Sequence, residues 1–279
     1  SAGVNLLLGP VPFEMFCRTR MLCADGQCKT FDAAANGYAR GEGCGVIALR
    51  RESDIPAGAF IATIKGSAVN QDGRSNGLTA PNGPSQEALI QRALQQAGVE
   101  AREVGYVECH GTGTKLGDPI EAQALGAALS EGHSAEEPVR IGSVKSNLGH
   151  TQAAAGVAGI IKTVLALEQE RIPKSLHAET LSRHIPWSEL PLKVVREEEA
   201  WLRSGRRRIA GVSSFGISGT NAHVVLEEAP VPGRGVQAPE RSAELVVVSA
   251  KSEAALREQA GRLGAHLQAN GDESLGDVA

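Results

Sequence analysis

The chain of 279 residues is long enough for one large domain plus an appendage, and it can bury a sizeable core. Its formal charge of −4, from 28 Lys and Arg against 32 Asp and Glu, gives no support to a nucleic-acid or membrane partner. No apolar run reaches the ~18 residues of a membrane span and no signal peptide precedes the first motif, so we expect a soluble, cytoplasmic setting.

The N-terminal part predicts short strands around a glycine-rich passage. We expect a strand over residues 4–8, a helical stretch near residues 13–21, and a β-hairpin that pairs residues 46–50 with residues 60–65. The glycines of residues 36–45 indicate close backbone packing or turns with positive φ. A phosphate-binding loop is the less favoured interpretation, because no helix start follows these glycines.

A long polar loop over residues 67–84 is the next feature, and loops of this length inside a domain are usually functional or act as lids. It ends where Pro84 opens a helix that Gly98 stops. A strand over residues 106–109 follows this helix.

A second helix is predicted after that strand and the loop that follows it. Asp118 supplies an N-cap, Pro119 occupies the first helical position, and Glu121 closes a capping box. The helix should run to about residue 129.

The rest of the core combines a strand over residues 139–144, a buried helix and a strand pair. Residues 153–161 are apolar nearly all round, which predicts a central helix between two sheets. Three prolines then punctuate an extended connection. Strands over residues 208–214 and 222–227 flank a glycine-rich turn.

Beyond residue 228 the composition shifts toward proline and glycine, which marks a linker. A strand over residues 245–249 and a helix over residues 253–268 then begin a second unit. The first and last residues resemble interior pieces of regular elements, so we expect the chain to be a fragment of a longer protein.

Two segments of similar design each deliver a histidine after a predicted strand. The first strand leads directly into His110, and the strand over residues 139–144 leads through Lys145 to His150. Because the carboxyl ends of parallel strands face a common crevice in an open α/β sheet, both histidines can share one pocket. Either histidine alone is more simply explained as structural, but the pair indicates a catalytic site. The Lys145 ammonium disfavours imidazolium and helps to keep a neighbouring ring neutral.

Three further patterns each leave two interpretations open. Thr112 and Thr114 alternate with glycines, so their hydroxyls either project to one side of the loop or cap the backbone. The turn at Phe215 and Gly216 either presents N–H groups to an oxyanion or simply reverses the chain. The basic cluster of residues 203–208 is either a solvated face or a docking site for an acidic protein.

The five cysteines have no metal-site spacing, so we expect no metal ion. Their odd number leaves at least one unpaired. In a cytoplasmic chain they are expected to be reduced thiols rather than a disulfide framework. They are Cys17, Cys23, Cys28, Cys44 and Cys109.

Four motifs in a fixed order carry a family resemblance. They are residues 70–73 (Asn-Gln-Asp-Gly), residues 110–114 (His-Gly-Thr-Gly-Thr), residues 145–150 (Lys-Ser-Asn-Leu-Gly-His) and residues 213–223 (Ser-Ser-Phe-Gly-Ile-Ser-Gly-Thr-Asn-Ala-His). Together they resemble the β-ketoacyl synthase domain of a type I modular polyketide synthase. Residues 240–279 resemble the start of the linker domain that joins such a synthase to an acyltransferase.

The resemblance implies an α/β fold, the thiolase-like αβαβα sandwich made of two similar halves. Residues 1–65 would form the end of the N-terminal ketosynthase half, and residues 66–228 the C-terminal half. Residues 229–279 would form a linker and the truncated α/β start of the ketosynthase-to-acyltransferase linker domain.

The implied reaction is a decarboxylative Claisen condensation in polyketide biosynthesis. An acyl chain moves to a cysteine, a malonyl-type extender on a carrier protein loses CO₂, and the resulting carbanion attacks the acyl thioester.

The matching positions imply a role for each residue of the site. His110 and His150 would stabilise the enolate and assist decarboxylation, and Lys145 would support His150. The N–H of Phe215 would complete an oxyanion hole, and its ring would gate the pocket. Substrate-binding residues would be Thr112 and Thr114, on the pantetheine arm, together with Gly216 and Asn147.

The resemblance implies no directly bound cofactor, because the substrates are carried on the phosphopantetheine of an acyl carrier protein. The other implied partners are the adjacent acyltransferase domain, the N-terminal ketosynthase half and a second copy in a homodimeric parent protein. No nucleic-acid or membrane partner is expected.

The chain departs from the family pattern in two places. The family's cysteine belongs to an acidic-Thr-Ala-Cys-Ser-Ser type of motif upstream of Ser1, and none of the five cysteines has that context. A nucleophilic thiol also needs an activating helix N-terminus or base, so the chain alone should be inactive. Gln152 stands where many relatives carry Glu, which puts a buried ion pair in doubt.

Two rival functions compete with a condensing enzyme. One is a non-condensing module that binds carrier proteins or acyl chains, and the pair of histidines argues against it. The other is a thiolase relative that acts on coenzyme A esters, which the appended linker and the threonine-containing loop disfavour.

Overall fold

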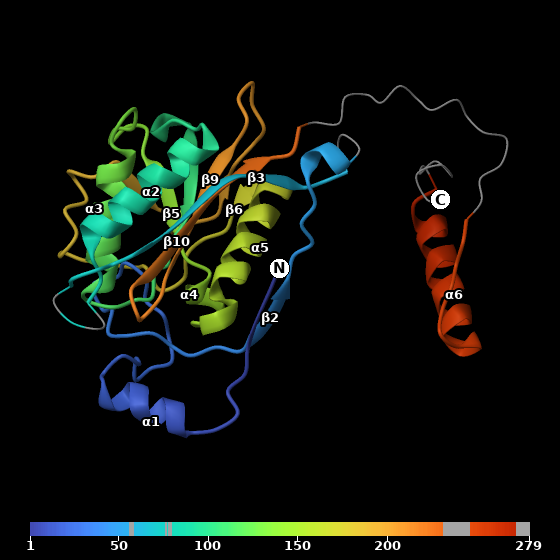
Figure 1. Ribbon diagram of the computed structural model, residues 1–279, viewed down its shortest axis with the longest axis horizontal. Helices are drawn as coiled ribbons and strands as arrows, with labels where there is room; N and C mark the ends of the chain where they lie inside the picture. The colour runs from blue at the N-terminus through green and yellow to red at the C-terminus, as the bar shows by residue number, and fades with distance from the viewer. Residues whose placement is uncertain (56–58, 76, 78–79, 231–245, 272–279) are drawn as a thin grey trace. The chain divides into compact units, whose positions relative to one another are not determined.

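The structure, a computed structural model, describes residues 1–55, 59–75, 77, 80–230 and 246–271 (Figure 1). The chain divides into two compact units, Ser1–Val231 and Pro232–Ala279. The first unit contains both histidines, and its sheet determines where they lie.

A six-stranded mixed sheet forms the centre of the first unit. Its strands, in spatial order, are β3 (Ala62–Gln71), β10 (Thr220–Glu228), β9 (Ile209–Phe215), β4 (Val104–Glu108), β5 (Val139–Gly142) and β7 (Leu192–Val194). β10 pairs antiparallel with both β3 and β9, whereas β4, β5 and β7 run parallel to β9. The predicted strand pair at the end of the core is confirmed, and the strands that precede the two histidines are neighbours.

Two helices cover one face of this sheet (Figure 1). α2 (Gly83–Ala97) packs on β3 and β10 and against α3 (Gly117–Leu129). α2 begins and ends as predicted, because the Asn82 side chain accepts a hydrogen bond from the N–H of Ser85 and Gly98 terminates it with a φ of 63°. The buried side chains between these helices and the sheet include Leu89, Ile90, Leu125, Val107 and Ile141.

α5 (Ala155–Glu168) covers the other face of the sheet and lies between two sheets. On one side it packs on β9 and β4, where a Cβ at Gly159 would lie 3.1 Å from Cγ1 of Val212. On the other side it meets a two-stranded antiparallel sheet of β1 (Ala2–Asn5) and β2 (Gly43–Val46). The predicted central helix is confirmed, and its small residues allow the close approach.

The predicted hairpin between residues 46–50 and 60–65 is wrong. β2 ends at Val46 and pairs with β1, while β3 pairs with β10. The predicted polar loop over residues 67–84 is wrong at its start, because β3 continues to Gln71. β3 is an edge strand with one exposed face, so polar side chains are compatible with its place in the sheet.

Several element boundaries also differ from the prediction. β1 begins and ends earlier than the strand expected over residues 4–8, and α1 covers Val11–Arg18. α3 has Leu116 at its N-cap, so the predicted capping box of Asp118 and Glu121 is wrong. The remaining elements are η1 (Glu52–Asp54), η2 (Ala101–Glu103), α4 (Lys145–Leu148), η3 (Gln152–Ala154) and the paired short strands β6 (Arg171–Ile172) and β8 (Glu199–Ala200).

In the second unit, α6 (Glu253–Ala269) confirms the predicted helix, and the hydroxyl of Ser252 accepts the N–H of Ala255 at its start. Leu245 of the strand predicted over residues 245–249 lies outside the described residues, and residues 246–249 form no strand. The boundaries 1–65, 66–228 and 229–279 stay predictions. Among the described residues, no helix is long and apolar enough to cross a membrane.

Candidate active site

Adjacent strand ends bring the two histidines together. β4 and β5 are parallel neighbours in which Glu108 lies opposite Gly142. His110 follows β4 by two residues, whereas His150 is reached through the single turn of α4. The two imidazole rings meet edge to face, with centroids 5.5 Å apart and planes at 85°.

The His150 segment is also fixed by a distant part of the chain. The N–H of His150 donates to the carbonyl of Ala39 at 2.7 Å, and its carbonyl accepts the N–H of Gly41 at 3.1 Å. A Cβ at Gly41 would lie 2.2 Å from the carbonyl oxygen of Leu148. The glycine-rich passage thus packs closely, as predicted, and what it packs against is a histidine segment.

Two buried carboxylates hold the loop that carries His110. The carboxylate of Glu121 accepts the N–H groups of His110 at 2.7 Å and Gly111 at 2.8 Å. Asp118 accepts the N–H groups of Gly113 at 3.1 Å and Thr114 at 3.3 Å, and that of Phe31 at 2.7 Å. The predicted helix caps therefore shape the loop instead, a role that sequence reasoning missed.

Hydrogen bonds to the ring nitrogens determine which tautomer each histidine adopts. The N–H of Phe215 donates to Nδ1 of His110 at 3.2 Å, and the N–H of Gln152 donates to Nδ1 of His150 at 3.0 Å. A neutral ring whose Nδ1 accepts must carry its proton on Nε2. No described residue takes up the Nε2–H of either ring, so both are available as donors.

The turn at Phe215 and Gly216 reverses the chain, which is one of its two predicted interpretations. The Phe215 N–H, expected to face an oxyanion, is donated to His110, and the Gly216 N–H is donated to the carbonyl of Thr220 at 2.7 Å. The Phe215 ring lies against His110, with centroids 5.5 Å apart.

Burial and nearby positive charge keep both rings neutral. Burial, followed by the charge of Lys145 and by His150, lowers the pKa of His110 well below 6.5. Burial, Lys145 and Arg40 lower the pKa of His150 to about 3. Lys145 is itself only 4% exposed, and burial lowers its pKa although Glu108 and Glu121 oppose the shift. At neutral pH the pair therefore presents two uncharged imidazoles.

The carboxyl groups of the loop respond to burial in the opposite way. Burial raises the pKa of Glu121 to about 7 and that of Asp118 to about 6, although the backbone N–H groups favour the charged forms. Both groups thus titrate close to neutral pH.

A cavity of about 460 Å³ opens between these residues. Its lining includes His110, His150, Thr112, Thr114, Phe215 and Gly216. The two threonine hydroxyl oxygens are 3.4 Å apart, and that of Thr114 also accepts the N–H of Gly117 at 3.1 Å. Of the predicted substrate-binding residues, Asn147 is the exception, since it is exposed on α4 and does not line the cavity.

Arg40 and Tyr38 are further site residues that the sequence did not single out. The Tyr38 ring packs on His150 with centroids 5.1 Å apart. Arg40 donates to the side-chain oxygen of Gln152 at 3.2 Å, and its Nε and Nη1 have no hydrogen-bond partner among the described residues. With Gln at position 152, the Arg40 guanidinium binds a neutral amide oxygen and not a carboxylate.

None of the five cysteines is placed as an activated nucleophile. Cys17 and Cys44 are exposed, and Cys23 has a raised pKa caused mainly by partial burial. Burial raises the pKa of Cys28 to about 11 and that of Cys109 well above 9. Within the described residues, no group of three or more His, Cys, Asp or Glu side chains could hold a metal ion.

Comparison with known families gives three adjoining matches. The β-ketoacyl synthase N-terminal domain matches residues 1–55, the β-ketoacyl synthase C-terminal domain matches residues 61–179, and the ketoacyl-synthetase C-terminal extension matches residues 182–278.

Curated relatives and solved structures agree with these matches. The chain is 51% identical over 277 residues to the spectinabilin polyketide synthase system protein NorB of Streptomyces orinoci, covering 96% of this chain and 13% of that protein. It is 49% identical over 280 residues to erythronolide synthase EryA3 of Saccharopolyspora erythraea, covering 100% of this chain and 9% of that one.

Among solved structures, a ketosynthase from module 6 of the bacillaene synthase of Bacillus subtilis 168 superimposes with a TM-score of 0.86 at 41% identity. The match covers 100% of this chain and 48% of that structure. The chain thus spans about half of a solved ketosynthase and a much smaller share of its curated relatives.

Proposed function

Because the chain belongs to the β-ketoacyl synthase family, with the thiolase-like C-terminal region and extension of a polyketide synthase ketosynthase, we propose that it supplies the two-histidine part of a condensing site. The reaction is the decarboxylative Claisen condensation of an acyl thioester with a carrier-bound malonyl-type extender. The observation that carries this proposal is the pair of neutral imidazoles on one cavity, each with an Nε2–H that no described residue accepts.

The chemistry of decarboxylation needs such donors. When the malonyl thioester loses CO₂, the electron pair of the broken bond moves into an enolate, and negative charge collects on the thioester oxygen. Two Nε2–H donors in a buried cavity stabilise that charge more in the transition state than in the substrate. The enolate carbon then attacks the acyl thioester carbon, and the cysteine thiolate leaves.

Neutrality of the rings matters for the same step. An imidazolium would deliver its proton to the carbanion, whereas a neutral imidazole stabilises the oxygen and leaves the carbon nucleophilic. Lys145 supports this state, since its charge is one of the causes of the low pKa values of both rings.

The rest of the cavity suits a carrier-bound substrate. Thr112 and Thr114 offer adjacent hydroxyls to the amides of a phosphopantetheine arm, so the substrates reach the site on a carrier protein. The Phe215 ring, which covers His110, would gate the acyl pocket beside Gly216.

The acyl-carrying cysteine is proposed to come from the N-terminal ketosynthase half, outside these 279 residues. The support is that buried Cys28 and Cys109 have raised pKa values and that exposed Cys17 and Cys44 lie outside the cavity lining. We therefore expect no mass increase when this chain alone is incubated with an acylated carrier protein. A covalent acyl adduct detected by intact-mass measurement would contradict this.

Apolar side chains outside the cavity suit the other proposed contacts. Val4, Leu8 and Val46 are 56%, 89% and 69% exposed, and a second, apolar groove of about 690 Å³ follows α5. The N-terminal half and a second copy in a homodimer would cover such surfaces. The acyltransferase domain would follow in the parent chain.

Two substitutions in the intact synthase test the proposal. His110→Ala and His150→Ala should each slow decarboxylation of a malonyl carrier protein on the order of 100- to 1,000-fold, because each removes one donor from the developing enolate. His133→Ala is a matched control, because the His133 ring contacts only the backbone carbonyls of Glu137 and Ala101 among its described hydrogen-bond partners. This substitution should leave the rate unchanged. A synthase without malonyl decarboxylation would instead be a carrier-protein or acyl-chain binding module.

A further inference from the structure

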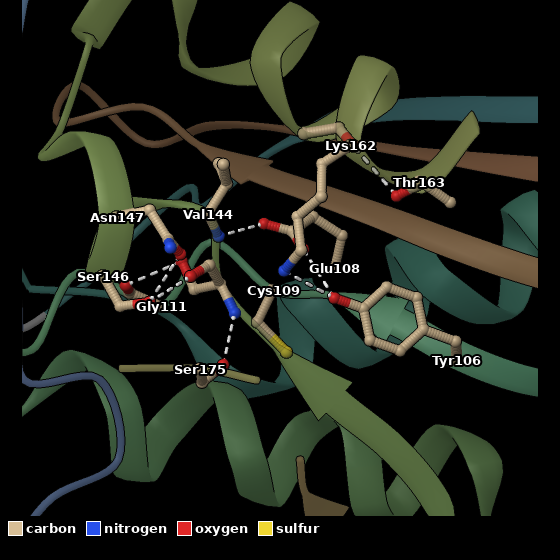
Figure 2. A network of polar contacts seen from close by, with 12 residues as sticks. Tyr106, Glu108, Cys109, Gly111, Val144, Ser146, Asn147, Lys162, Thr163 and Ser175 are labelled. Atoms are coloured by element: carbon tan, nitrogen blue, oxygen red, sulfur yellow. Dashed lines mark hydrogen bonds and ion pairs between the residues drawn. The ribbon is translucent and has the colours of Figure 1, made fainter. Parts of the chain in front are cut away.

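A buried carboxylate outside the cavity lining connects the two histidine segments. Glu108, the last residue of β4, is 1% exposed. One oxygen accepts the N–H of Val144 at 2.5 Å, and the other accepts the Tyr106 hydroxyl at 2.7 Å and Nζ of Lys162 at 2.7 Å. Figure 2 shows Glu108 between Val144 on one side and Tyr106 and Lys162 on the other.

The hydrogen bond from Val144 to Glu108 connects the segment of His150 with the segment of His110. Glu108 precedes His110 by two residues on the same strand. Val144 lies in the turn after β5, directly before Lys145, and its chain continues through α4 to His150. This hydrogen bond therefore ties the Val144 turn to the first segment, in addition to the bonds from the Cys109 N–H to the Gly142 carbonyl and from the Ser143 hydroxyl to the Gly111 carbonyl.

Lys162 and Tyr106 hold this carboxylate in place. Lys162 reaches Glu108 from α5, and its Nζ also donates to the Tyr106 hydroxyl at 2.9 Å. Burial, reinforced by Glu108, raises the pKa of Tyr106 well above 10, so its hydroxyl stays a donor. An unpaired carboxylate at this depth would be strongly disfavoured.

We propose that Glu108 is a positioning residue for the condensing site, which it serves by fixing the Val144 turn and with it Lys145 and His150 relative to His110. This inference rests on the proposed function. Glu108 is not part of the cavity lining, so it acts through the histidine segments and not on the substrate. The alternative is a purely structural ion pair, whose loss would lower stability alone.

Two neutral double variants separate these possibilities. Glu108→Gln with Lys162→Met removes both charges but keeps an acceptor for the N–H of Val144. Glu108→Leu with Lys162→Met has nearly the same volume and lacks that acceptor. Because both replace a buried ion pair with neutral groups of similar size, both should fold.

The measurement is made on the intact synthase, per folded molecule, with acyl loading of the cysteine and malonyl decarboxylation assayed separately. We expect the Leu–Met variant to decarboxylate roughly 10- to 100-fold more slowly, because a shift of about 1 Å at the reacting groups has an effect of this size. The Gln–Met variant should stay close to the wild-type rate, and acyl loading should be unchanged in both.

A matched control lies at the other end of the sheet, where Arg208 and Glu228 form a second buried ion pair. Replacing it by Met and Gln should change stability without changing the rate. The inference is overturned if the Leu–Met and Gln–Met variants decarboxylate equally fast or equally slowly. If His110→Ala and His150→Ala also keep the wild-type rate, the proposed function itself fails; if they are slow while both double variants are normal, only the positioning role fails.

Discussion

The two ends of the central sheet solve the burial of charge in different ways. At the end away from the histidines, Glu228 accepts the backbone N–H of Arg208 at 2.9 Å and its Nε and Nη2 at 2.8 and 2.5 Å. Arg208 also donates to the carbonyls of Leu167 and Trp201. Nε of Arg203 lies 3.5 Å from the same carboxylate, so the charge of Glu228 is neutralised by arginine side chains.

At the histidine end, the carboxylates bind mainly the backbone. Glu121 and Asp118 accept five N–H groups and have no cation within hydrogen-bonding reach among the described residues. They fix the loop that carries His110, and within the described part of the chain nothing accepts the Nε2–H of His110 or His150. One end thus pairs its buried carboxylate with arginine, and the other uses its buried carboxyl groups to fix the backbone of the proposed site.

The largest effect is expected from breaking the buried ion pair of Arg208 and Glu228. Arg208→Met removes the side-chain hydrogen bonds that Glu228, which is 4% exposed, receives from Arg208. It leaves the backbone N–H and the longer, partly exposed contact with Nε of Arg203 at 3.5 Å, so it should lower the free energy of unfolding by about 3–5 kcal/mol. Denaturant unfolding of the intact ketosynthase measures this. Arg207→Met is the matched control, because Arg207 pairs with Glu227 while its side chain is 54% exposed, and should cost less than about 1 kcal/mol. Equal losses of unfolding free energy would show that the buried pair and the exposed pair contribute alike.

The next effect is a pH dependence of opposite sign at the two ends. Burial raises the pKa of Glu121 from 4.5 to about 7. Between these two pH values the carboxyl group is protonated in the folded state and ionised in the unfolded state. Stability from this group is present below about pH 4.5 and is lost as the pH rises through about 7. At Glu228, burial favours a higher pKa, but the hydrogen bonds and charge of Arg208 outweigh it and lower the pKa, so that stability is lost on acidification.

Unfolding free energies of wild type and Glu121→Gln, measured between pH 4.5 and 7, test the first sign. The advantage of the wild type should decline by on the order of 1–3 kcal/mol across this window. Glu136→Gln, at an exposed carboxyl whose pKa is lowered by Ser134, should show no such decline. A constant difference for Glu121 would mean that the carboxyl ionises normally in the folded chain.

The smallest effect concerns a doubly bound carbonyl at the histidine end. The carbonyl of Gly111 accepts the hydroxyls of Thr30 at 2.7 Å and Ser143 at 3.1 Å. Ser143→Ala should therefore cost only about 1 kcal/mol, because Thr30 still satisfies the carbonyl and the Lys145 N–H loses only a long contact of 3.3 Å to the Ser143 hydroxyl. Ser143→Ala with Thr30→Val should cost more than the sum of the single changes. Additive costs in thermal or denaturant unfolding would show that the two hydroxyls act independently.

Local signals in the sequence predicted the parts of the fold that local chemistry decides. Pro84 and Gly98 bound α2, the apolar run of residues 153–161 forms the end of η3 and the first half of α5, and a glycine-rich turn joins β9 and β10. The partner of β2 was not predictable in this way, since its pairing with β1 joins segments about 40 residues apart by register alone.

The same limit applies to the site. The motifs located His110 and His150, but the contacts that fix their tautomers come from Phe215 and Gln152. Glu108 was also missed, although the sequence contains a signal for it. It is a charged residue at the end of an apolar strand, and a charged side chain that is buried there needs buried partners.

The contact between Gly41 and the carbonyl of Leu148 matters for anyone who recombines such chains. The two positions are far apart in sequence, yet any side chain at position 41 would collide with the peptide that leads into His150. If a recombination point lies between residues 41 and 148, one parent supplies position 41 and the other supplies position 148. A chimaeric chain built there keeps its imidazole in place only if the first parent also contributes glycine.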